Sequence, residues 1–250
     1  MLWRAILSGA TALGLFVYSP STEAQVPLRK DRAYYEQRGF VIWEAHTKEK
    51  LMALTFDDGP DQEKTDEILN LLEQYQAKST FFVIGRKVLQ YPDVVRRIVR
   101  EGHEVANHTF SHVFFKLPAS EQLVQSEIEQ TEEAIFITTG IGTKLFRPPG
   151  GMYDETVIRV SSEMGLFPVM WSWHQDTRDW AHPGVQKIIR KVLKNARSGD
   201  IVLFHDHVAG KSQTIPALKV ILPELKARGY RLVTVSELIQ AQKNSPIPDH

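Results

Sequence analysis

The 250-residue chain contains no cysteine. It therefore has no disulfide scaffold, no thiolate nucleophile and no metal site built on sulfur, so a bound metal must be held by His, Asp or Glu. The chain also lacks a net charge, because 30 Lys and Arg balance 30 Asp and Glu. Proteins that bind nucleic acid usually carry a basic excess or stripe, so this balance argues against nucleic acid as a partner.

The apolar stretch near the N-terminus is short. Ala5–Tyr18 covers 14 residues after the single cation Arg4, whereas a membrane-spanning helix needs roughly 20. The stretch fits the apolar region of a secretory signal, and Thr22-Glu23-Ala24 offers a cleavage site of small residues. We expect residues 1–24 to be a signal peptide or, alternatively, an uncleaved N-terminal membrane anchor; both export the rest of the chain.

Short β-type runs alternate with amphipathic helical stretches from Leu51 onward, with no repeat or Pro/Ser-rich linker to divide them. This alternation predicts an α/β fold with a mainly parallel sheet, either an open doubly wound sheet or a shortened βα barrel. We expect one domain at 51–240, an N-terminal extension at 25–50 and a polar tail at 241–250. The predicted strands are Leu51–Phe56, Ser79–Ile84, Glu104–Ala106, Leu145–Arg147, Phe167–Trp171, Ile201–Phe204 and Arg231–Val235. The predicted helices are Lys64–Tyr75, Asp93–Arg100, Ser120–Ile137, Glu155–Met164, Gln186–Asn195 and Pro216–Arg228.

Two adjacent carboxylates follow the first predicted strand. The strand runs directly into Asp57 and Asp58, and a Gly-Pro turn follows them. In parallel βα architectures, polar groups at the carboxyl ends of strands face the active site. Neighbouring carboxylates repel each other unless a cation or hydrogen-bond donors stabilise them. We therefore favour a functional site here over a surface turn.

A pair of histidines follows the third predicted strand. His108 and His112 are four residues apart, so on a helical turn both imidazoles would point the same way. This spacing suits two ligands of one metal ion, although it is a weak signal when it occurs alone. Together with Asp58, the pair would leave an open coordination position for water, as in a catalytic zinc site.

Two further clusters combine rigid or aromatic residues with polar groups. Phe146–Gly151 places Arg147 beside two prolines and two glycines, which fix the backbone and permit close approach to a ligand. An Arg at a strand end can form a bidentate pair with a carboxylate, although a surface Arg is an equally good interpretation. Trp171–Trp180 contains three Trp among polar groups, a composition that indicates the edge of a cleft suited to sugar rings.

The last cluster, Ile201–His207, is a buried strand that ends in ionisable groups. Either His205 or His207 is a candidate general acid, and Asp179 could orient it from a distant part of the sequence. We expect the remaining histidines to be structural or surface residues: His46, His103, His174, His182 and His250.

These five clusters, in this order along the chain, resemble the polysaccharide deacetylase family, the NodB homology domain of carbohydrate esterase family 4. The resemblance runs from about Leu51 to Gln240. It implies a distorted, incomplete (β/α) barrel of about seven parallel strands. The chain departs from the family pattern at Gly150-Gly151, where many members have an aromatic residue or Tyr-Gly. The matching motifs are Thr55-Phe56-Asp57-Asp58-Gly59-Pro60, His108-Thr109-Phe110-Ser111-His112, Arg147-Pro148-Pro149-Gly150, Asp176-Thr177-Arg178-Asp179-Trp180 and Leu203-Phe204-His205.

The resemblance implies a role for each motif. Zn²⁺, or another divalent ion such as Co²⁺, would be bound by Asp58, His108 and His112. Asp57 would be the general base, kept ionised by Arg147. His205 would be the general acid, with Asp179 holding its imidazolium form. The implied substrate contacts are Trp180, Leu203, Pro149 and Gly150.

The resemblance also implies the substrate class and the compartment. The extension Tyr34–Gly39 and the export signal are most similar to Bacillus-type exported deacetylases, which favours N-acetylglucosamine in peptidoglycan or chitooligosaccharides. The implied partner is therefore an N-acetylated glycan, with no stable protein partner, met by a secreted or cell-wall-associated protein. The alternatives are an N-acetylmuramic acid deacetylase, an O-acetyl (acetylxylan) esterase and a catalytically silent glycan-binding module.

Overall fold

The computed structural model describes residues 30–244. The expected signal peptide or anchor at 1–24 and residues 245–250 of the expected tail lie outside the described residues. Within residues 30–244, no helix has both the length and the hydropathy needed to cross a membrane.

A seven-stranded sheet with parallel pairing forms the centre of the protein, which confirms the predicted α/β fold. The strand order is β5-β4-β3-β2-β1-β6, and β7 pairs with the start of β1. All seven residues of β1 are buried, as expected for a parallel strand covered on both faces. The strands are β1 (Leu51–Asp57), β2 (Ser79–Val83), β3 (Glu104–Asn107), β4 (Leu145–Phe146), β5 (Phe167–Pro168), β6 (Ile201–His205) and β7 (Arg231–Leu232).

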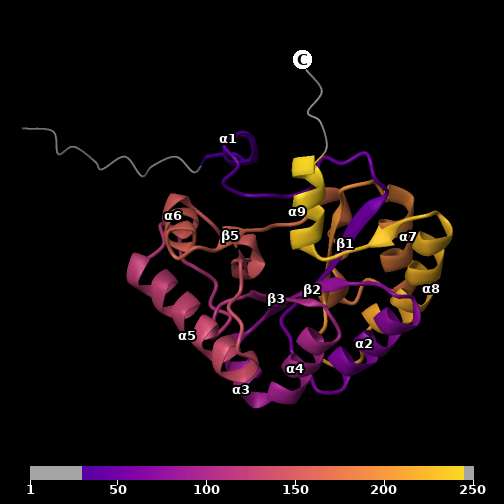
Figure 1. Ribbon diagram of the computed structural model, residues 1–250, viewed down its shortest axis with the longest axis horizontal. Coiled ribbons are helices and arrows are strands. Elements are labelled where there is room, and N and C mark those ends of the chain that lie inside the picture. Colours follow the sequence, from indigo (N-terminus) through magenta and orange to yellow (C-terminus); the bar gives the residue numbers. More distant parts are fainter. Residues whose placement is uncertain (1–29, 245–250) are drawn as a thin grey trace, which may run out of the picture.

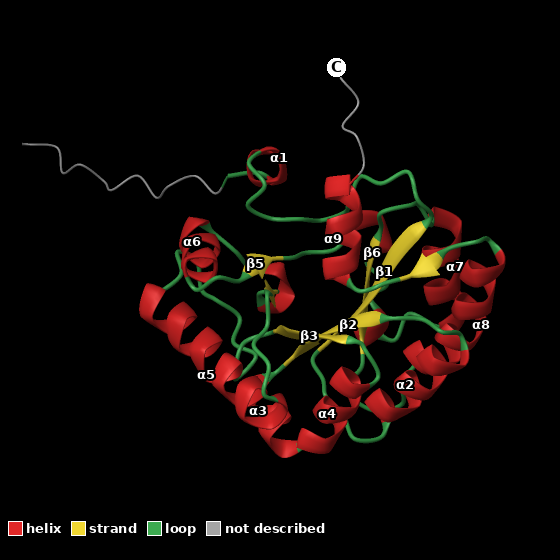
Figure 2. Cartoon of the chain, viewed as in Figure 1, coloured by secondary structure: helices red, strands yellow, loops and turns green. Residues whose placement is uncertain are grey.

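Helices follow the strands and lie in an arc around the outside of the sheet (Figures 1 and 2). The apolar stripe of each amphipathic helix packs inward; in α2 it includes Ile68 and Leu72, both fully buried. The helices are α1 (Arg32–Gln37), α2 (Lys64–Gln74), α3 (Gly85–Gln90), α4 (Pro92–Arg100), α5 (Glu121–Thr139), α6 (Glu155–Glu163), α7 (Val185–Asn195), α8 (Thr214–Ala227) and α9 (Val235–Asn244). Three short 3₁₀ turns, η1 (Pro149–Gly151), η2 (Trp173–Gln175) and η3 (Asp179–Ala181), lie in the loops.

The segment before β1 bridges the two edge strands of the sheet. Ile42 pairs in parallel with Val169 just after β5, and Glu44 pairs antiparallel with Asp200 just before β6. Trp43, between them, is only 2% exposed. The bridging segment satisfies backbone groups that an edge strand would otherwise leave unpaired, and it narrows the gap in the incomplete barrel.

Several predicted boundaries differ from the observed ones. The strand predicted at Phe167–Trp171 ends at Pro168, because the next residues hydrogen-bond to the bridging segment, with Met170 N–H donating to the Ile42 carbonyl at 2.8 Å. The short helices α1 and α3 were not predicted, and neither was α9, which includes residues 241–244 of the expected polar tail. These helices are stabilised by packing: α9, for example, buries Val235 and Leu238.

Candidate active site

The carboxyl ends of the parallel strands bring the sequence clusters together around one cavity. Asp57 ends β1, His205 ends β6, and the two residues are direct partners in the strand register. The cavity has a volume of about 520 Å³. Its lining residues are Asp57, Asp58, His108, His112, Phe114, Gly150, Trp171, Asp176, Arg178, Trp180, Leu203 and His205.

Two imidazoles and one carboxylate converge at the floor of this cavity. The Nε2 atoms of His108 and His112 lie 3.3 and 3.0 Å from Oδ1 of Asp58. Potential ligand atoms of the three residues all lie within 4.8 Å of one another. Burial would raise the pKa of the Asp58 carboxyl, but hydrogen bonds and charge from the two imidazoles lower it.

The chemistry of this cluster fits a divalent cation. The Nδ1 of His108 lies 2.7 Å from the Arg147 carbonyl, so Nδ1 carries the proton and the lone pair of Nε2 faces Asp58. Lone pairs of a neutral imidazole and a carboxylate repel each other at about 3 Å unless a cation or a proton lies between them. Two His and one Asp also match the ligand set of a zinc site that keeps an open position.

The two histidines are not on a helical turn, contrary to the expectation from their spacing. Residues 108–112 form a loop in which Thr109 and His112 have left-handed φ angles of 67° and 61°. Asp58 is also left-handed, with a φ of 75°, and Lys87 Nζ donates a 2.7 Å hydrogen bond to its carbonyl. With three non-glycine residues in this rarely populated region, the loops turn the side chains of Asp58, His108 and His112 toward one point.

Asp57 is held from behind by a fully buried guanidinium. Arg147 Nη1 donates to Asp57 Oδ1 at 2.6 Å and to Thr55 Oγ1 at 2.9 Å. The other guanidinium nitrogens donate to the carbonyls of Val169 and Met170. Oδ2 of Asp57 is left facing the cluster of Asp58, His108 and His112, 3.8 Å from His108 Nε2. The buried pair therefore fixes the direction in which Asp57 offers its free oxygen.

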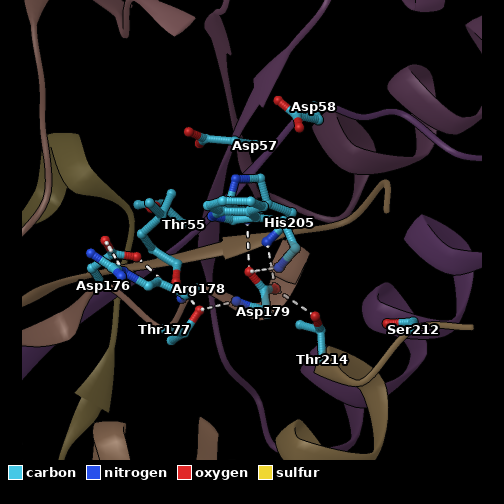
Figure 3. A network of polar contacts seen from close by, with 12 residues as sticks. Thr55, Asp57, Asp58, Asp176, Thr177, Arg178, Asp179, His205, Ser212 and Thr214 are labelled. Carbon is cyan, nitrogen blue, oxygen red and sulfur yellow. Dashed lines mark hydrogen bonds and ion pairs between the residues drawn. The ribbon is translucent and has the colours of Figure 1, made fainter. Parts of the chain in front are cut away.

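His205 is held in a similar way by Asp179. The Nδ1 of His205 lies 2.7 Å from Asp179 Oδ1, and Thr214 Oγ1 donates to Asp179 Oδ2 at 2.5 Å. Figure 3 shows His205 between the Asp57–Asp58 pair on one side and Asp179 with Thr214 on the other. Burial would lower the pKa of His205, but the hydrogen bond and charge of Asp179, with the charges of Asp57 and Asp58, raise it to about 9.

The structure distinguishes His205 from His207 as the residue at the cavity. The side chain of His207 is 43% exposed, and its Nδ1 lies 2.9 Å from Asp61 Oδ2, outside the cavity lining. Of the expected substrate contacts, Trp180, Leu203 and Gly150 line the cavity. Pro149 is buried and does not line it.

Sequence reasoning missed several residues at the cavity, among them Phe114 and Trp171 as lining residues. It also missed the role of Asp206 behind the first motif. This carboxyl is 1% exposed and accepts a 2.6 Å hydrogen bond from Thr65 Oγ1, and burial raises its pKa to about 7. A Cβ added to Gly59 would lie 2.1 Å from an oxygen of Asp206, so only glycine fits at this turn.

Two other features lie away from these motifs. A larger cavity of about 830 Å³ lies between the N-terminal segment and α9, but none of the expected site residues lines it. Glu44, His174 and Asp200 also place potential ligand atoms within 4.8 Å of one another. There, His174 Nε2 lies 2.8 Å from Asp200 Oδ1, and Arg32 donates to Glu44, so hydrogen bonds within the protein already satisfy these groups.

Known proteins are similar to this chain in both sequence and fold. The family model for polysaccharide deacetylase matches residues 44–169. A peptidoglycan-N-acetylglucosamine deacetylase of Bacillus cereus is 47% identical over 213 residues, which cover 85% of this chain and 98% of that protein. A chitooligosaccharide deacetylase of Rhizobium leguminosarum bv. trifolii is 39% identical, covering 81% of this chain and 97% of that protein.

Two solved structures extend the similarity to three dimensions. The Bc1960 peptidoglycan N-acetylglucosamine deacetylase superposes with a TM-score of 0.79 at 34% identity, covering 83% of this chain and 96% of that chain. A family 4 acetyl xylan esterase of Clostridium thermocellum, in complex with a cobalt ion, superposes with a TM-score of 0.71 at 34% identity, covering 79% of this chain and 93% of that chain.

Proposed function

Since the chain belongs to the polysaccharide deacetylase family, we propose that it removes N-acetyl groups from N-acetylglucosamine residues of peptidoglycan or chitooligosaccharides. Water and the acetamide would react to give acetate and a free amine. The observation that carries this proposal is the arrangement of Asp57 and His205. They end two neighbouring strands in direct register and line the same cavity as the His-His-Asp cluster.

In this proposal Asp58, His108 and His112 hold Zn²⁺ or another divalent ion such as Co²⁺. When bound, the ion would supply a Lewis acid that polarises the acetamide carbonyl and lowers the pKa of a water molecule. The protein contributes a fixed ligand geometry, because His108 is anchored to the Arg147 carbonyl and the Asp58 carbonyl to Lys87.

Asp57 is the proposed general base. One of its oxygens is occupied by Arg147, so the other is the one available to accept a proton from the attacking water. Thr55 and two backbone carbonyls hold the guanidinium in place, so Asp57 does not need to reorganise during the reaction. As water attacks the carbonyl carbon, the carbonyl oxygen gains negative charge. The backbone N–H of Gly150 donates to no protein group among residues 30–244, and it is the proposed donor to that oxygen.

His205 is the proposed general acid. Asp179 accepts a hydrogen bond from Nδ1–H and favours the imidazolium form, so Nε2–H is left to protonate the departing amine nitrogen as the C–N bond breaks. Leu203 and Trp180 are the proposed walls around the acetyl methyl group, since both line the cavity next to His205. We further propose that the protein acts outside the cell, as the N-terminal sequence suggests, in the cell wall or anchored to the membrane by its N-terminus.

Acetate release from defined glycans tests the function. Purified protein is incubated with chitopentaose and with peptidoglycan, acetate is quantified and the products are mapped by mass spectrometry. We expect acetyl loss from N-acetylglucosamine units, its abolition by a chelator and its recovery with added Zn²⁺ or Co²⁺. Loss of acetyl groups from N-acetylmuramic acid units instead, or from acetylxylan alone, would show that the protein acts on that substrate and not on N-acetylglucosamine. Binding of these glycans without acetate release from any of them would identify a silent module.

A further inference from the structure

An exposed aromatic ring outside the five motifs stands at the mouth of the cavity. Of the exposed large hydrophobic side chains among residues 30–244, only Phe114 and Trp180 line the cavity, and they are 60% and 57% exposed. Trp180 was expected to contact substrate, but Phe114 was not. A single exposed aromatic ring is common, but here two such rings line one polar cavity, where a bound ligand could cover their apolar surface.

Phe114 continues a row of rings that leads outward from the proposed metal site. The ring centroids of His108 and His112 are 5.2 Å apart, and those of His112 and Phe114 are also 5.2 Å apart. His108 is buried, His112 is partly buried and Phe114 is exposed. Phe114 meets His112 edge to face, at an interplanar angle of 82°. Its position is therefore tied to the site, while most of its surface remains open to solvent.

A glycine creates the space that the Phe114 ring occupies. A Cβ added to Gly150 would lie 2.6 Å from Cε1 of Phe114, so a side chain at position 150 would displace the ring. Gly150 has a φ of 62°, which a non-glycine residue rarely adopts. The glycine that removes a side chain from the third motif thus leaves room for an aromatic ring from the loop after β3. The apolar surface over position 150 is supplied by Phe114.

The two exposed aromatic residues lie close in sequence to different parts of the proposed site, Phe114 to the proposed metal ligands and Trp180 to the Asp179–His205 pair. Phe114 lies two residues after the proposed ligand His112, and Trp180 directly follows Asp179, which holds His205. Flat aromatic rings stack on the C–H faces of pyranose rings, and neither aromatic brings a charge that a neutral sugar would have to match. An extended glycan could therefore contact an aromatic residue at each part of the site.

We propose that Phe114 is a sugar-binding platform, which stacks on the pyranose ring of a glycan unit at the mouth of the cavity. This inference rests on the proposed function for its substrate, N-acetylglucosamine oligomers. The proposal assigns to Phe114 a contribution to substrate affinity and none to the chemical step, because the ring packs on the edge of the site against His112 and not against Asp57 or His205.

Binding and turnover of chitopentaose by Phe114 variants test the proposal. The variants are Phe114→Ala, Phe114→Leu, which keeps an apolar side chain without a flat face, and Phe114→Tyr, which restores the ring. Phe136→Ala is the matched control, because Phe136 is also 60% exposed but lies on α5 and does not line the cavity. We expect the Ala and Leu variants to raise the KM and the Kd for chitopentaose roughly five- to tenfold. The kcat and the Zn²⁺ affinity of the Ala and Leu variants should match those of the wild type. The Tyr variant and the Phe136→Ala control should also keep the wild-type KM and Kd for chitopentaose.

Three outcomes would overturn the proposal. An unchanged Kd and KM in both the Ala and Leu variants would show that the ring contributes no affinity. A fall in kcat and in Zn²⁺ affinity at constant KM would instead make Phe114 a positioning residue for His112. A wild-type protein that does not bind chitopentaose would exclude this ligand. The Kd needs no turnover, so a protein that binds through Phe114 but releases no acetate would refute the proposed function and leave the platform standing.

Discussion

His205 and Asp179 are joined by two hydrogen bonds, one from the imidazole and one from the backbone of the same residue. Nδ1 of His205 lies 2.7 Å from Asp179 Oδ1, and the His205 backbone N–H donates to Oδ2 at 2.9 Å. The ring is therefore fixed relative to its own main chain, with Nδ1 protonated and Nε2 free for the cavity.

The first prediction concerns the basic limb of the pH profile. Burial alone would lower the pKa of His205, but Asp179, with Asp57 and Asp58, raises it to about 9 from a usual value of 6.5. In the proposed mechanism activity requires the protonated imidazole, so kcat/KM should fall as the pH rises through about 9. Asp179→Asn removes the largest favourable charge, and the limb should move toward 6.5. A profile of the variant with an unmoved basic limb would contradict the role given to Asp179.

The first prediction extends to folding stability, because the same pair sets the pKa of His205 in the folded protein. Because the pKa of His205 is higher in the folded than in the unfolded protein, its contribution to the free energy of unfolding is complete below about pH 6.5 and disappears as the pH rises through about 9. Urea unfolding at a series of pH values should show this decline in the wild type and a weaker one in Asp179→Asn. Equal slopes in the two proteins would exclude the linkage.

The second prediction concerns the metal ligands. His108→Ala or His112→Ala removes one of three ligands, so we expect the affinity for Zn²⁺ to fall by more than about 100-fold and acetate release to fall with it. His207→Ala is the matched control, because His207 binds Asp61 outside the cavity. Isothermal titration with Zn²⁺ and an acetate assay measure the two effects. A ligand variant with wild-type affinity and activity would show that the assigned site is wrong.

The third prediction concerns the buried ion pair. Arg147→Met preserves much of the side-chain volume but leaves the Asp57 carboxylate buried without its cation. Breaking such a pair costs about 3–5 kcal/mol of unfolding free energy. Adding Asp57→Asn removes the stranded charge, so the double variant should regain part of the stability and remain inactive. Arg178→Met, at an exposed Arg, serves as the control. A stable Arg147→Met protein, measured by chemical denaturation, would contradict the argument.

The fourth prediction concerns acid stability. Burial lowers the pKa of His103, and the positive charges of Lys78 and Arg97 lower it further, to about 4. The buried neutral ring accepts a hydrogen bond from the Ser79 N–H. The neutral ring contributes to the free energy of unfolding in full above about pH 6.5. As the pH falls from 6.5 toward 4, this free energy decreases by about 3 kcal/mol, because the unfolded protein binds the proton first. His103→Gln should flatten this decline, and a variant whose stability falls with pH as steeply as that of the wild type would refute the prediction.

The fifth prediction concerns the N-terminus. If residues 1–24 are a cleaved signal, the full chain expressed in a secreting host should appear in the medium with Gln25 as its first residue. N-terminal mass spectrometry and fractionation measure this outcome. A protein that retains Met1 and stays with the membrane fraction would establish the anchor instead.

Much of the site follows from local sequence. Asp57 and His205 each end a run of apolar, β-branched or aromatic residues, and such runs form buried parallel strands whose carboxyl ends share one edge of the sheet. The type and order of the functional groups were therefore predictable. The same holds for the helices with a clear apolar stripe, such as α2.

Other features depend on contacts that no local pattern encodes. The pairing of Ile42 with Val169 shortens β5 and joins residues more than a hundred positions apart. The convergence of His108 and His112 depends on a left-handed backbone at Thr109 and His112. The four-residue spacing of the two histidines had suggested a helical turn instead. The place of Phe114 depends on the space above Gly150.

The sequence alone supplies the chemical groups of the candidate site: without cysteine, any metal ligand had to be an imidazole or a carboxylate, and the order of the motifs along the chain indicated the family. The tertiary structure decides which of these groups lie together. It joins Arg147 to Asp57 and Asp179 to His205, and it separates His207 from the cavity. The physical reason is that a side chain's residue type and its place at a strand end are local properties, whereas its partners depend on strand register, loop conformation and the space that neighbouring residues leave.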